Sequence, residues 1–358
     1  MSKILIVTNH SYMLYRFRLE LIQSLIAEHE VVLSMPFVGH EDDFKALGLR
    51  CIETDVDRRG INPKTDFKLF RTYWKILKTE KPDMVITYSI KPNIYMGLAC
   101  AMTGTPYCSN VQGLGTAFQR KGLAAFVTAL YKLAFCRVKT VFFENEGNAS
   151  EFVQRNILKR EKITVLHGAG INLEKYPCCT YPNNEKLRFL YLGRIMREKG
   201  IDELFCAVQR LPAGRFVLDM VGFFEDEYKQ QVEELEAKGI VKFHGFQSDP
   251  HPYYENADCV VLPSYHEGMS NVLLEAAAVG RPVITSDIPG CREAVELEVS
   301  GLLCKVQDAD SLYEQMAQML DFSKEQRTQM GLAGRRRMEL EFAKERVVAQ
   351  TIQAIFGK

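Results

Sequence analysis

The sequence lacks the features of a membrane-spanning or disulfide-bonded protein. No stretch approaches the ~20 apolar residues of a transmembrane helix, and the apolar run in MSKILIVTNH is too short for a signal peptide. The ten cysteines include no CxxC pair and show no even spacing, which predicts reduced cytosolic thiols. The seven histidines are scattered without metal-ligand spacing, so we expect no metal site.

The sequence also lacks low-complexity tracts and net charge, but its charge is unevenly spread. Residues 1–180 hold 24 Lys and Arg against 17 Asp and Glu, a net of +7, so the remainder carries −7. This asymmetry, unless it arose by chance, indicates a polyanionic or membrane-surface partner for the first half. We expect an anionic membrane surface and no nucleic acid.

Short apolar runs alternate with helical periodicity along the chain, which predicts parallel sheets covered on both faces. A length of 358 residues favours two domains over one core. Strands are predicted at Lys3–Thr8, Val31–Ser34, Met84–Thr87, Thr105–Asn110, Thr140–Phe143, Arg188–Leu192, Arg215–Val221, Val241–Phe243, Cys259–Leu262 and Pro282–Thr285. Helices are predicted at Tyr15–Ala27, Gly200–Gln209, Glu225–Lys238, Asn271–Val279 and Ala343–Phe356.

The alternation breaks at YPCCTYPNN, Tyr176–Asn184, where two prolines and two asparagines indicate a linker. We expect a first domain over residues 1–175, a second over 185–342, and a C-terminal helix, about 343–358, that crosses back to the first. The fold class is therefore α/β, with two doubly wound Rossmann-like domains facing a deep cleft. In such domains ligands bind at the carboxyl ends of the strands.

One stretch, SYHEGMSNVLLEAAAVGRPVITSD, places two acids at the end of a predicted strand. Glu267 lies in the loop that follows Cys259–Leu262, and Glu275 lies within the apolar helix Asn271–Val279. Ser270 is a suitable N-cap for this helix. Since a helix N-terminus favours anions, the N–H groups of Met269 to Asn271 are expected to point into the cleft.

Two cations follow another predicted strand. In LGRIMREKG, Arg194 and Lys199 flank a loop that enters the helix at Gly200. Paired cations there suit a diphosphate; the alternative is a solvated charged loop. Likewise, Glu275 alone could be a helix-surface acid and Glu267 a loop carboxylate.

These motifs together carry a family resemblance. GRIMREKG followed by EGMSNVLLEAAAVGRPV resembles the C-terminal domain of family 4 retaining glycosyltransferases, which have the GT-B fold, and the E-x7-E pair is their donor-sugar signature. First-domain motifs resemble the CapM-like capsular and exopolysaccharide branch. They are TYSIKPNIYMGLAC (Thr87–Cys100), NVQGLGTAFQRKG (Asn110–Gly122), FFENEGN (Phe142–Asn148) and GAGINLEKYP (Gly168–Pro177).

The resemblance implies a role for each site residue. Glu275 would accept hydrogen bonds from ribose hydroxyls, and Glu267 would contact donor-sugar hydroxyls near the reacting carbon. Arg194 and Lys199 would hold the diphosphate and stabilise the leaving group. The remaining donor-binding positions are Gly193, Gly268, Met269, Ser270 and Asn271.

Two departures concern the acceptor side. Thr8–Ser11 replaces the glycine-rich loop of many relatives, and Gln112 stands where many have a histidine. Gln112 can bond a sugar hydroxyl but cannot act as a base, which fits front-side displacement better than general-base catalysis. His10 and Arg16 could bind acceptor or phosphate; alternatively His10 ends a strand and Arg16 is a helix-face charge. The pattern assigns no role to Lys91 and Asn93.

The segment Arg120–Lys139 predicts a basic amphipathic helix. Its apolar residues are expected on one helical face, with five cations around that face. Helices that lie in the surface of anionic bilayers have this pattern. The alternative is a helix packed on the sheet. The apolar residues are Leu123, Phe126, Val127, Leu130, Leu133 and Ala134.

The resemblance implies an enzyme that moves a sugar from a nucleotide-diphosphate sugar, UDP-linked, to a polyprenyl-diphosphate-linked saccharide with retention. We expect no cofactor and no metal requirement, and a cytoplasmic protein attached peripherally to the inner face of the cell membrane. Two alternatives stay open, a nucleotide-sugar epimerase of the same fold and a non-catalytic nucleotide-sugar-binding partner. An epimerase would need an acid/base set that the sequence does not display.

Overall fold

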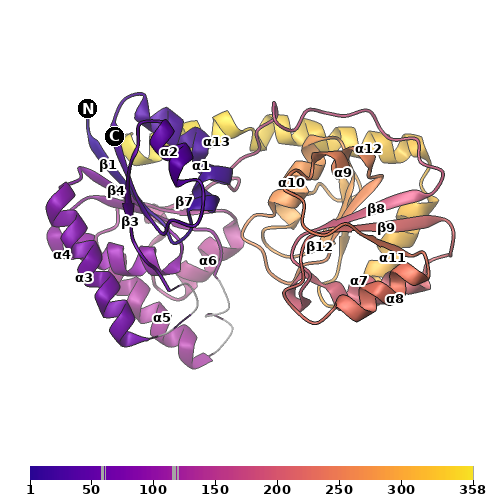
Figure 1. Ribbon diagram of the computed structural model, residues 1–358, viewed down its shortest axis with the longest axis horizontal. Helices are drawn as coiled ribbons and strands as arrows, with labels where there is room; N and C mark the ends of the chain where they lie inside the picture. The colour runs from indigo at the N-terminus through magenta and orange to yellow at the C-terminus, as the bar shows by residue number, and fades with distance from the viewer. Residues whose placement is uncertain (58–59, 61, 115–117, 119–120, 358) are drawn as a thin grey trace. The chain divides into compact units, whose positions relative to one another are not determined.

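The computed structural model describes residues 1–357 except 58–59, 61, 115–117 and 119–120. The chain divides into two compact units (Figure 1). The first contains Met1–Gly170 and Glu345–Lys358, and the second contains Ile171–Lys344. The C-terminal segment therefore returns to the first unit, as the sequence predicted.

The first unit contains a seven-stranded sheet in the order β3-β2-β1-β4-β5-β6-β7. All neighbouring strands are parallel. The strands are β1 Lys3–Val7, β2 Glu30–Met35, β3 Arg50–Glu53, β4 Met84–Tyr88, β5 Tyr107–Val111, β6 Val141–Phe143 and β7 Ile163–Val165. The helices are α1 Ser11–Ile26, α2 Glu41–Ala46, α3 Pro63–Glu80, π-helix η1 Pro92–Met96, α4 Gly97–Thr103, α5 Lys121–Ala134, α6 Glu146–Gln154, η3 Arg160–Lys162 and α13 Lys344–Phe356.

Helices cover both faces of this sheet (Figure 1). Because side chains alternate across a strand, Ile4 and Ile6 join a core with α1 and α13, whereas Leu5 and Val7 join a core with α3 and α5. Such double burial explains the continuous apolar strand KILIV. Helix α13 is also tied by Lys139, whose Nζ donates to the Ile355 carbonyl over 2.6 Å.

The second unit contains a six-stranded parallel sheet in the order β10-β9-β8-β11-β12-β13. Its strands are β8 Leu187–Leu192, β9 Phe216–Val221, β10 Val241–Phe243, β11 Cys259–Leu262, β12 Val283–Ser286 and β13 Gly301–Cys304. Its helices are η4 Arg197–Lys199, α7 Ile201–Arg210, α8 Lys229–Ala237, α9 His251–Asn256, α10 Asn271–Ala278, η5 Arg292–Ala294, α11 Ala309–Asp321, α12 Lys324–Arg337 and π-helix η6 Met338–Phe342.

The fold class is confirmed: each unit is a doubly wound parallel α/β domain. In each sheet the strand order reverses once, between β1 and β4 and between β8 and β11. Ligands bind doubly wound sheets outside the carboxyl ends of the strands at this switch point. The loops after β8 and β11 are therefore where a ligand of the second unit is expected.

The predicted linker Tyr176–Asn184 is packed rather than free. Tyr176 is buried in the second unit's core, and Arg281 donates to the carbonyls of Cys179 and Thr180 over 3.2 and 2.8 Å. The unit boundary lies earlier, between Gly170 and Ile171. Composition indicated irregular backbone correctly, but long-range hydrogen bonds hold that backbone against the domain. We call residues 176–184 the belt.

Among the described residues, no helix combines the length and the hydrophobicity that crossing a bilayer requires.

Candidate functional site

The loops after β8 and β11 are in contact with each other at the switch point of the second unit's sheet. Gly200 has φ +73°, and a Cβ there would lie 2.1 Å from the Pro263 carbonyl oxygen. The N–H of Tyr265 donates to the Glu198 carbonyl over 2.9 Å. Glycine is required at position 200 because its backbone is left-handed and the neighbouring chain leaves no room for a side chain.

This contact brings Lys199 and Glu267 together. The Lys199 Nζ lies 2.5 Å from Glu267 Oε1, and the Ser264 hydroxyl donates to the same oxygen over 2.8 Å. The two charged side chains are only 18% and 14% exposed. Burying an ion pair costs free energy unless its hydrogen bonds have good geometry. Charged groups that are buried at such a cost are common at functional sites. Because this pair also lies at the switch point, we take it as a candidate ligand site.

Glu275 is buried inside the second unit, which excludes the helix-surface alternative. It is 4% exposed on α10, and the buried Tyr254 hydroxyl donates to its Oε2 over 2.8 Å. A buried carboxylate needs such a donor. Sequence reasoning missed Tyr254, because α9 is a short helix far from Glu275 in sequence and the motif gives no signal for it.

The N-terminus of α10 differs in part from the expectation. Ser270 occupies the N-cap position, but its side chain makes no capping hydrogen bond. Its N–H donates to the Gly290 carbonyl over 2.9 Å, so it does not point to a ligand. A Cβ on Gly290 would lie 2.3 Å from the Gly268 carbonyl. The loop after β12 therefore supports the backbone at Gly268 and Ser270, and Met269 between them is buried.

Arg194 lies in the loop after β8. Its Nη1 is 3.3 Å from Glu225 Oε2 in the loop after β9, and its side chain is 44% exposed. The Tyr191 hydroxyl donates to the Arg194 carbonyl over 2.6 Å. Gly193 contacts the same neighbouring loop, because a Cβ on Gly222 would lie 1.8 Å from the Gly193 carbonyl oxygen. The loop backbone is thus fixed while the guanidinium stays half accessible.

The three acceptor-side candidates lie on or beside the first turns of α1. The His10 ring lies edge-on to Tyr12 at 6.1 Å, and Arg16 Nη1 donates to the Tyr12 hydroxyl over 2.8 Å. Gln112 follows β5, and its Nε2 lies 3.4 Å from the Met13 sulfur. All three lie at the carboxyl edge of the first sheet, where the fold places ligands.

The same edge holds a buried ion pair that sequence reasoning missed. The Arg18 Nη2 lies 2.7 Å from Glu144 Oε1, and the Arg18 guanidinium lies 5.4 Å from the centre of the Tyr88 ring. Glu144 belongs to FFENEGN, which the sequence analysis singled out without giving its residues a role. Arg18 lies within the predicted helix Tyr15–Ala27, but the sequence analysis did not single it out.

Lys91 and Asn93 make structural contacts. The Lys91 Nζ lies 2.7 Å from Asp66 Oδ1 on α3. The Asn93 amide donates to the Asn110 carbonyl over 2.8 Å, and its oxygen accepts from Thr87 over 2.7 Å. Asn93 therefore ties the ends of β4 and β5.

Helix α5 does not form the single apolar face that the sequence predicted. Val127 and Ala134 are buried, whereas Phe126 and Leu133 are 53% and 60% exposed. The helix packs on the sheet through one stripe, as the second alternative holds, and exposes another stripe; contact with a bilayer stays a prediction. Arg120 lies outside the described residues, and the side chain of Lys121 is not described either.

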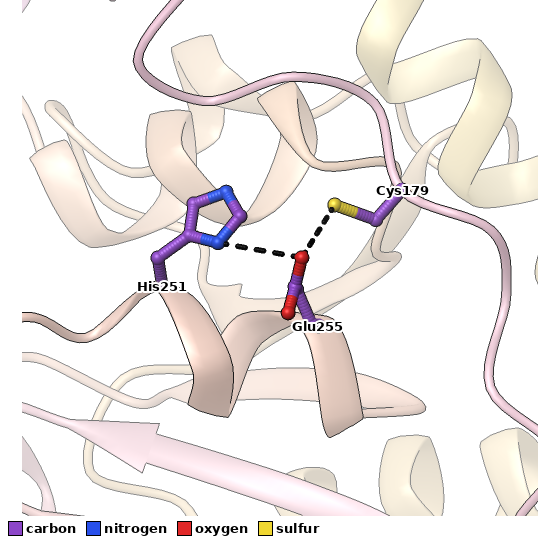
Figure 2. A group of neighbouring side chains, drawn as sticks. All are labelled: Cys179, His251 and Glu255. Carbon is purple, nitrogen blue, oxygen red and sulfur yellow. Dashed lines mark hydrogen bonds and ion pairs between the residues drawn. The ribbon is translucent and has the colours of Figure 1, made fainter.

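A possible metal-ligand group also escaped sequence reasoning. Ligand atoms of Cys179, His251 and Glu255 all lie within 4.8 Å of one another (Figure 2). The sequence analysis missed this group because His251 and Glu255 share the face of a short helix, α9, that the sequence did not predict, and because the folded belt supplies the thiol.

Comparisons with known proteins agree with this architecture. The family model described as "Glycosyl transferases group 1" matches residues 180–337, and that described as "Glycosyl transferase 4-like" matches residues 3–145. Together they cover most of both units, and they define a glycosyltransferase. The chain belongs to family 4 of the glycosyltransferases and has the GT-B fold.

Relatives of the chain include enzymes of polysaccharide assembly, two of which are named for diphospho-undecaprenol-linked saccharides. N,N'-diacetylbacillosaminyl-diphospho-undecaprenol alpha-1,3-N-acetylgalactosaminyltransferase of Campylobacter jejuni is 29% identical over 96% of each chain. The capsular polysaccharide biosynthesis glycosyltransferase CapM of Staphylococcus aureus is 26% identical over 82% of this chain and 83% of its own. UDP-Gal:alpha-D-GlcNAc-diphosphoundecaprenol alpha-1,3-galactosyltransferase of Escherichia coli is 27% identical over 74% and 73%.

Solved structures share the fold. Anabaena HepE, crystallised with UDP and glucose, superimposes with a TM-score of 0.81 over 99% of both chains at 16% identity. The lipopolysaccharide glycosyltransferase WaaG superimposes with a TM-score of 0.74 over 99% of this chain and 100% of its own, also at 16% identity.

Proposed function

We propose that this glycosyltransferase moves a sugar from a UDP-sugar, an N-acetylhexosamine or a hexose, to a polyprenyl-diphosphate-linked saccharide with retention at the anomeric carbon. The observation that carries the proposal is the Lys199–Glu267 pair at the switch point of the second sheet. The names of the Campylobacter and Escherichia relatives support the acceptor class. Surface polysaccharide or glycan assembly is the corresponding process.

On the donor side, Lys199 and Arg194 bind the diphosphate. An ammonium has three N–H donors, so Lys199 can donate to a phosphate oxygen while it keeps its bond to Glu267. The half-exposed Arg194 exchanges its 3.3 Å contact with Glu225 for a phosphate. Both cations then stabilise negative charge that grows on the leaving group, as fixed charges do in other active sites.

The two glutamates bind hydroxyl groups. Glu267 has one oxygen engaged by Lys199 and Ser264, and it positions donor-sugar hydroxyls near the reacting carbon. Glu275, fixed by Tyr254, accepts hydrogen bonds from the ribose diol. Hydrogen bonds to charged groups contribute about 1.5–3 kcal/mol each, so each glutamate can supply a tenfold or larger preference for its hydroxyls.

Transfer proceeds by front-side displacement. The acceptor hydroxyl oxygen bonds to the anomeric carbon on the face from which the diphosphate leaves, and the hydroxyl proton passes to a leaving phosphate oxygen. This route needs no protein base, which agrees with Gln112 at the position where many relatives have a histidine. His10, Arg16 and Gln112 contact the acceptor saccharide or its phosphates.

The enzyme acts in the cytoplasm at the inner face of the cell membrane, bound peripherally through its first unit. Three neighbouring helices, α3, α4 and α5, cover one face of the first sheet (Figure 1). Each exposes large apolar side chains, which are Phe67, Met102, Phe126 and Leu133. Exposed cations accompany them, namely Lys64, Lys68, Arg71, Lys75, Lys78 and Lys132. We call these residues the basic-apolar face; it suits an anionic bilayer surface.

The test is a transfer assay with the purified protein, a panel of UDP-N-acetylhexosamines and UDP-hexoses, and polyprenyl-diphosphate-linked saccharides. We expect a product one sugar longer, with the anomeric configuration of the donor by NMR. Conversion of the donor without acceptor would favour the epimerase instead. Absence of turnover with the whole panel, from protein that binds UDP, would favour a binding partner and contradict the proposal.

A further inference from the structure

The second unit brings a thiol, an imidazole and a carboxylate together away from the Lys199–Glu267 pair. His251 and Glu255 lie one turn apart on α9, and Cys179 comes from the belt that crosses this helix (Figure 2). Glu255 Oε1 lies 3.5 Å from both the Cys179 sulfur and His251 Nδ1. The three side chains therefore converge on one small volume at the domain surface.

These distances suit a tetrahedral metal ion. Zinc binds sulfur at about 2.3 Å and nitrogen or oxygen at about 2.0–2.2 Å, so ligand atoms on tetrahedral zinc lie roughly 3.5 Å apart. The two measured edges already have this length. The third requires only a small rotation of the partly exposed Cys179, because all three ligand atoms lie within 4.8 Å.

The present contacts leave these groups weakly satisfied. His251 Nδ1 reaches Glu255 only at 3.5 Å. The Cys179 thiol has a single proton and reaches the Pro177 carbonyl at 3.3 Å or Glu255 at 3.5 Å. A thiolate, an imidazole and a carboxylate are ligands that zinc accepts together, whereas Mg²⁺ and Ca²⁺ prefer oxygen alone.

We propose that Cys179, His251 and Glu255 form a Zn²⁺ site with water as the fourth ligand. Binding releases the thiol proton, as thiolate coordination requires. The ion joins the belt to α9. The same helix carries the buried Tyr254, whose hydroxyl donates to Glu275. Zinc at this position therefore stabilises the second unit and does not take part in sugar transfer, so the proposal stands apart from the proposed function.

The test uses full-length protein that has been reduced, stripped of metal and titrated with Zn²⁺ against a chromophoric zinc indicator. We expect one tight equivalent that excess Mg²⁺ does not displace. Cys179→Ser, His251→Gln and Glu255→Gln should each weaken binding at least about 100-fold, more than loss of an outer-shell partner does. Co²⁺ in the same site should give a thiolate charge-transfer band that Cys179→Ser removes.

The matched control is Cys178→Ser. Cys178 is the adjacent exposed thiol, with its sulfur beside Gly280, and this variant should bind zinc like the wild type. Metal-free melting curves establish that each variant is folded, and saturating zinc should raise the melting temperature of the wild type by about 5 °C. Zinc binding as tight as that of the wild type in all three ligand variants, or its loss in Cys178→Ser, would overturn the assignment.

Discussion

At the scale of the residue, the proposed donor site depends on the hydrogen bonds that hold its two carboxylates. Replacing Tyr254 by Phe removes the donor to the buried Glu275 and leaves the ring in place. A lost hydrogen bond to a charged group costs about 1.5–3 kcal/mol. We therefore expect the KM for the nucleotide sugar to rise at least about tenfold and the free energy of unfolding to fall.

Steady-state kinetics and urea unfolding measure these two quantities. The control is Tyr253→Phe, on the same helix but packed against His244. Equal KM values for the nucleotide sugar in Tyr254→Phe and the wild type would show that Glu275 does not bind the donor.

Glu267→Gln and Lys199→Ala test the paired charges. Each should lower kcat by about 10²–10³, the usual loss when one fixed electrostatic contact to a transition state is removed. Arg197→Ala, in the same loop but on an exposed side chain, should leave kcat within about twofold. Near-normal turnover in both site variants, with circular dichroism unchanged, would contradict the assignment.

Sequence reasoning at this scale singled out Glu267, Glu275 and Lys199 as candidates, because they lie at fixed offsets within motifs that follow strands. It could not identify Tyr254 or the Arg18–Glu144 pair. Those contacts join segments far apart in the chain, and only the completed sheet brings them together. Motif spacing thus nominates candidate site residues, while the residues that contact them are found only from the structure.

At the scale of the element, two loops are joined through Gly200. Gly200→Ala should lower the free energy of unfolding by more than Gly239→Ala. Both glycines have similar left-handed φ values, +73° and +69°, but only at Gly200 would the new Cβ meet a backbone oxygen, at 2.1 Å. Left-handed alanine alone costs about 1–2 kcal/mol, and the clash adds to it.

Urea unfolding of both variants measures the difference, and the assay should show lost activity only in Gly200→Ala. Equal destabilisation of the two variants would mean that the loop after β11 can move away, so that the loop contact does not fix Lys199 beside Glu267.

Prediction of elements succeeded for most strands, including β10 at the edge of the second sheet. β10 and β11 have the predicted bounds, and the other predicted strands agree within two residues. β3, β7 and β13 were missed. β3 and β7 are short, half-exposed strands, and β13 begins with a glycine, so all three lack a long apolar run. The fold class survived because the buried strands determine the alternation.

At the scale of the whole molecule, transfer should persist in EDTA. In the proposed mechanism, Arg194 and Lys199 supply the positive charge that a divalent ion supplies in other transferases. EDTA should remove zinc from the proposed site and lower the melting temperature while the rate at 25 °C stays within about twofold. Rates and melting curves measured with and without EDTA check both effects. Abolished transfer that Mg²⁺ or Mn²⁺ restores would show that catalysis needs a metal.

The first unit should bind anionic vesicles reversibly, and more weakly as salt rises. Each cation near an anionic surface contributes about 1 kcal/mol, which salt screens, and each buried apolar side chain adds roughly 1.5–3 kcal/mol.

The variants that test this binding leave Lys139 unchanged, because its side chain is bonded to α13. Sedimentation should show weaker pelleting after Phe126→Ser with Leu133→Ser, and after Lys68→Ser, Lys75→Ser and Lys132→Ser. Leu332→Ser with Leu340→Ser, exposed in the second unit, should pellet like the wild type. Equal pelleting of all variants, or equal binding to neutral vesicles, would mean that this face does not contact the bilayer.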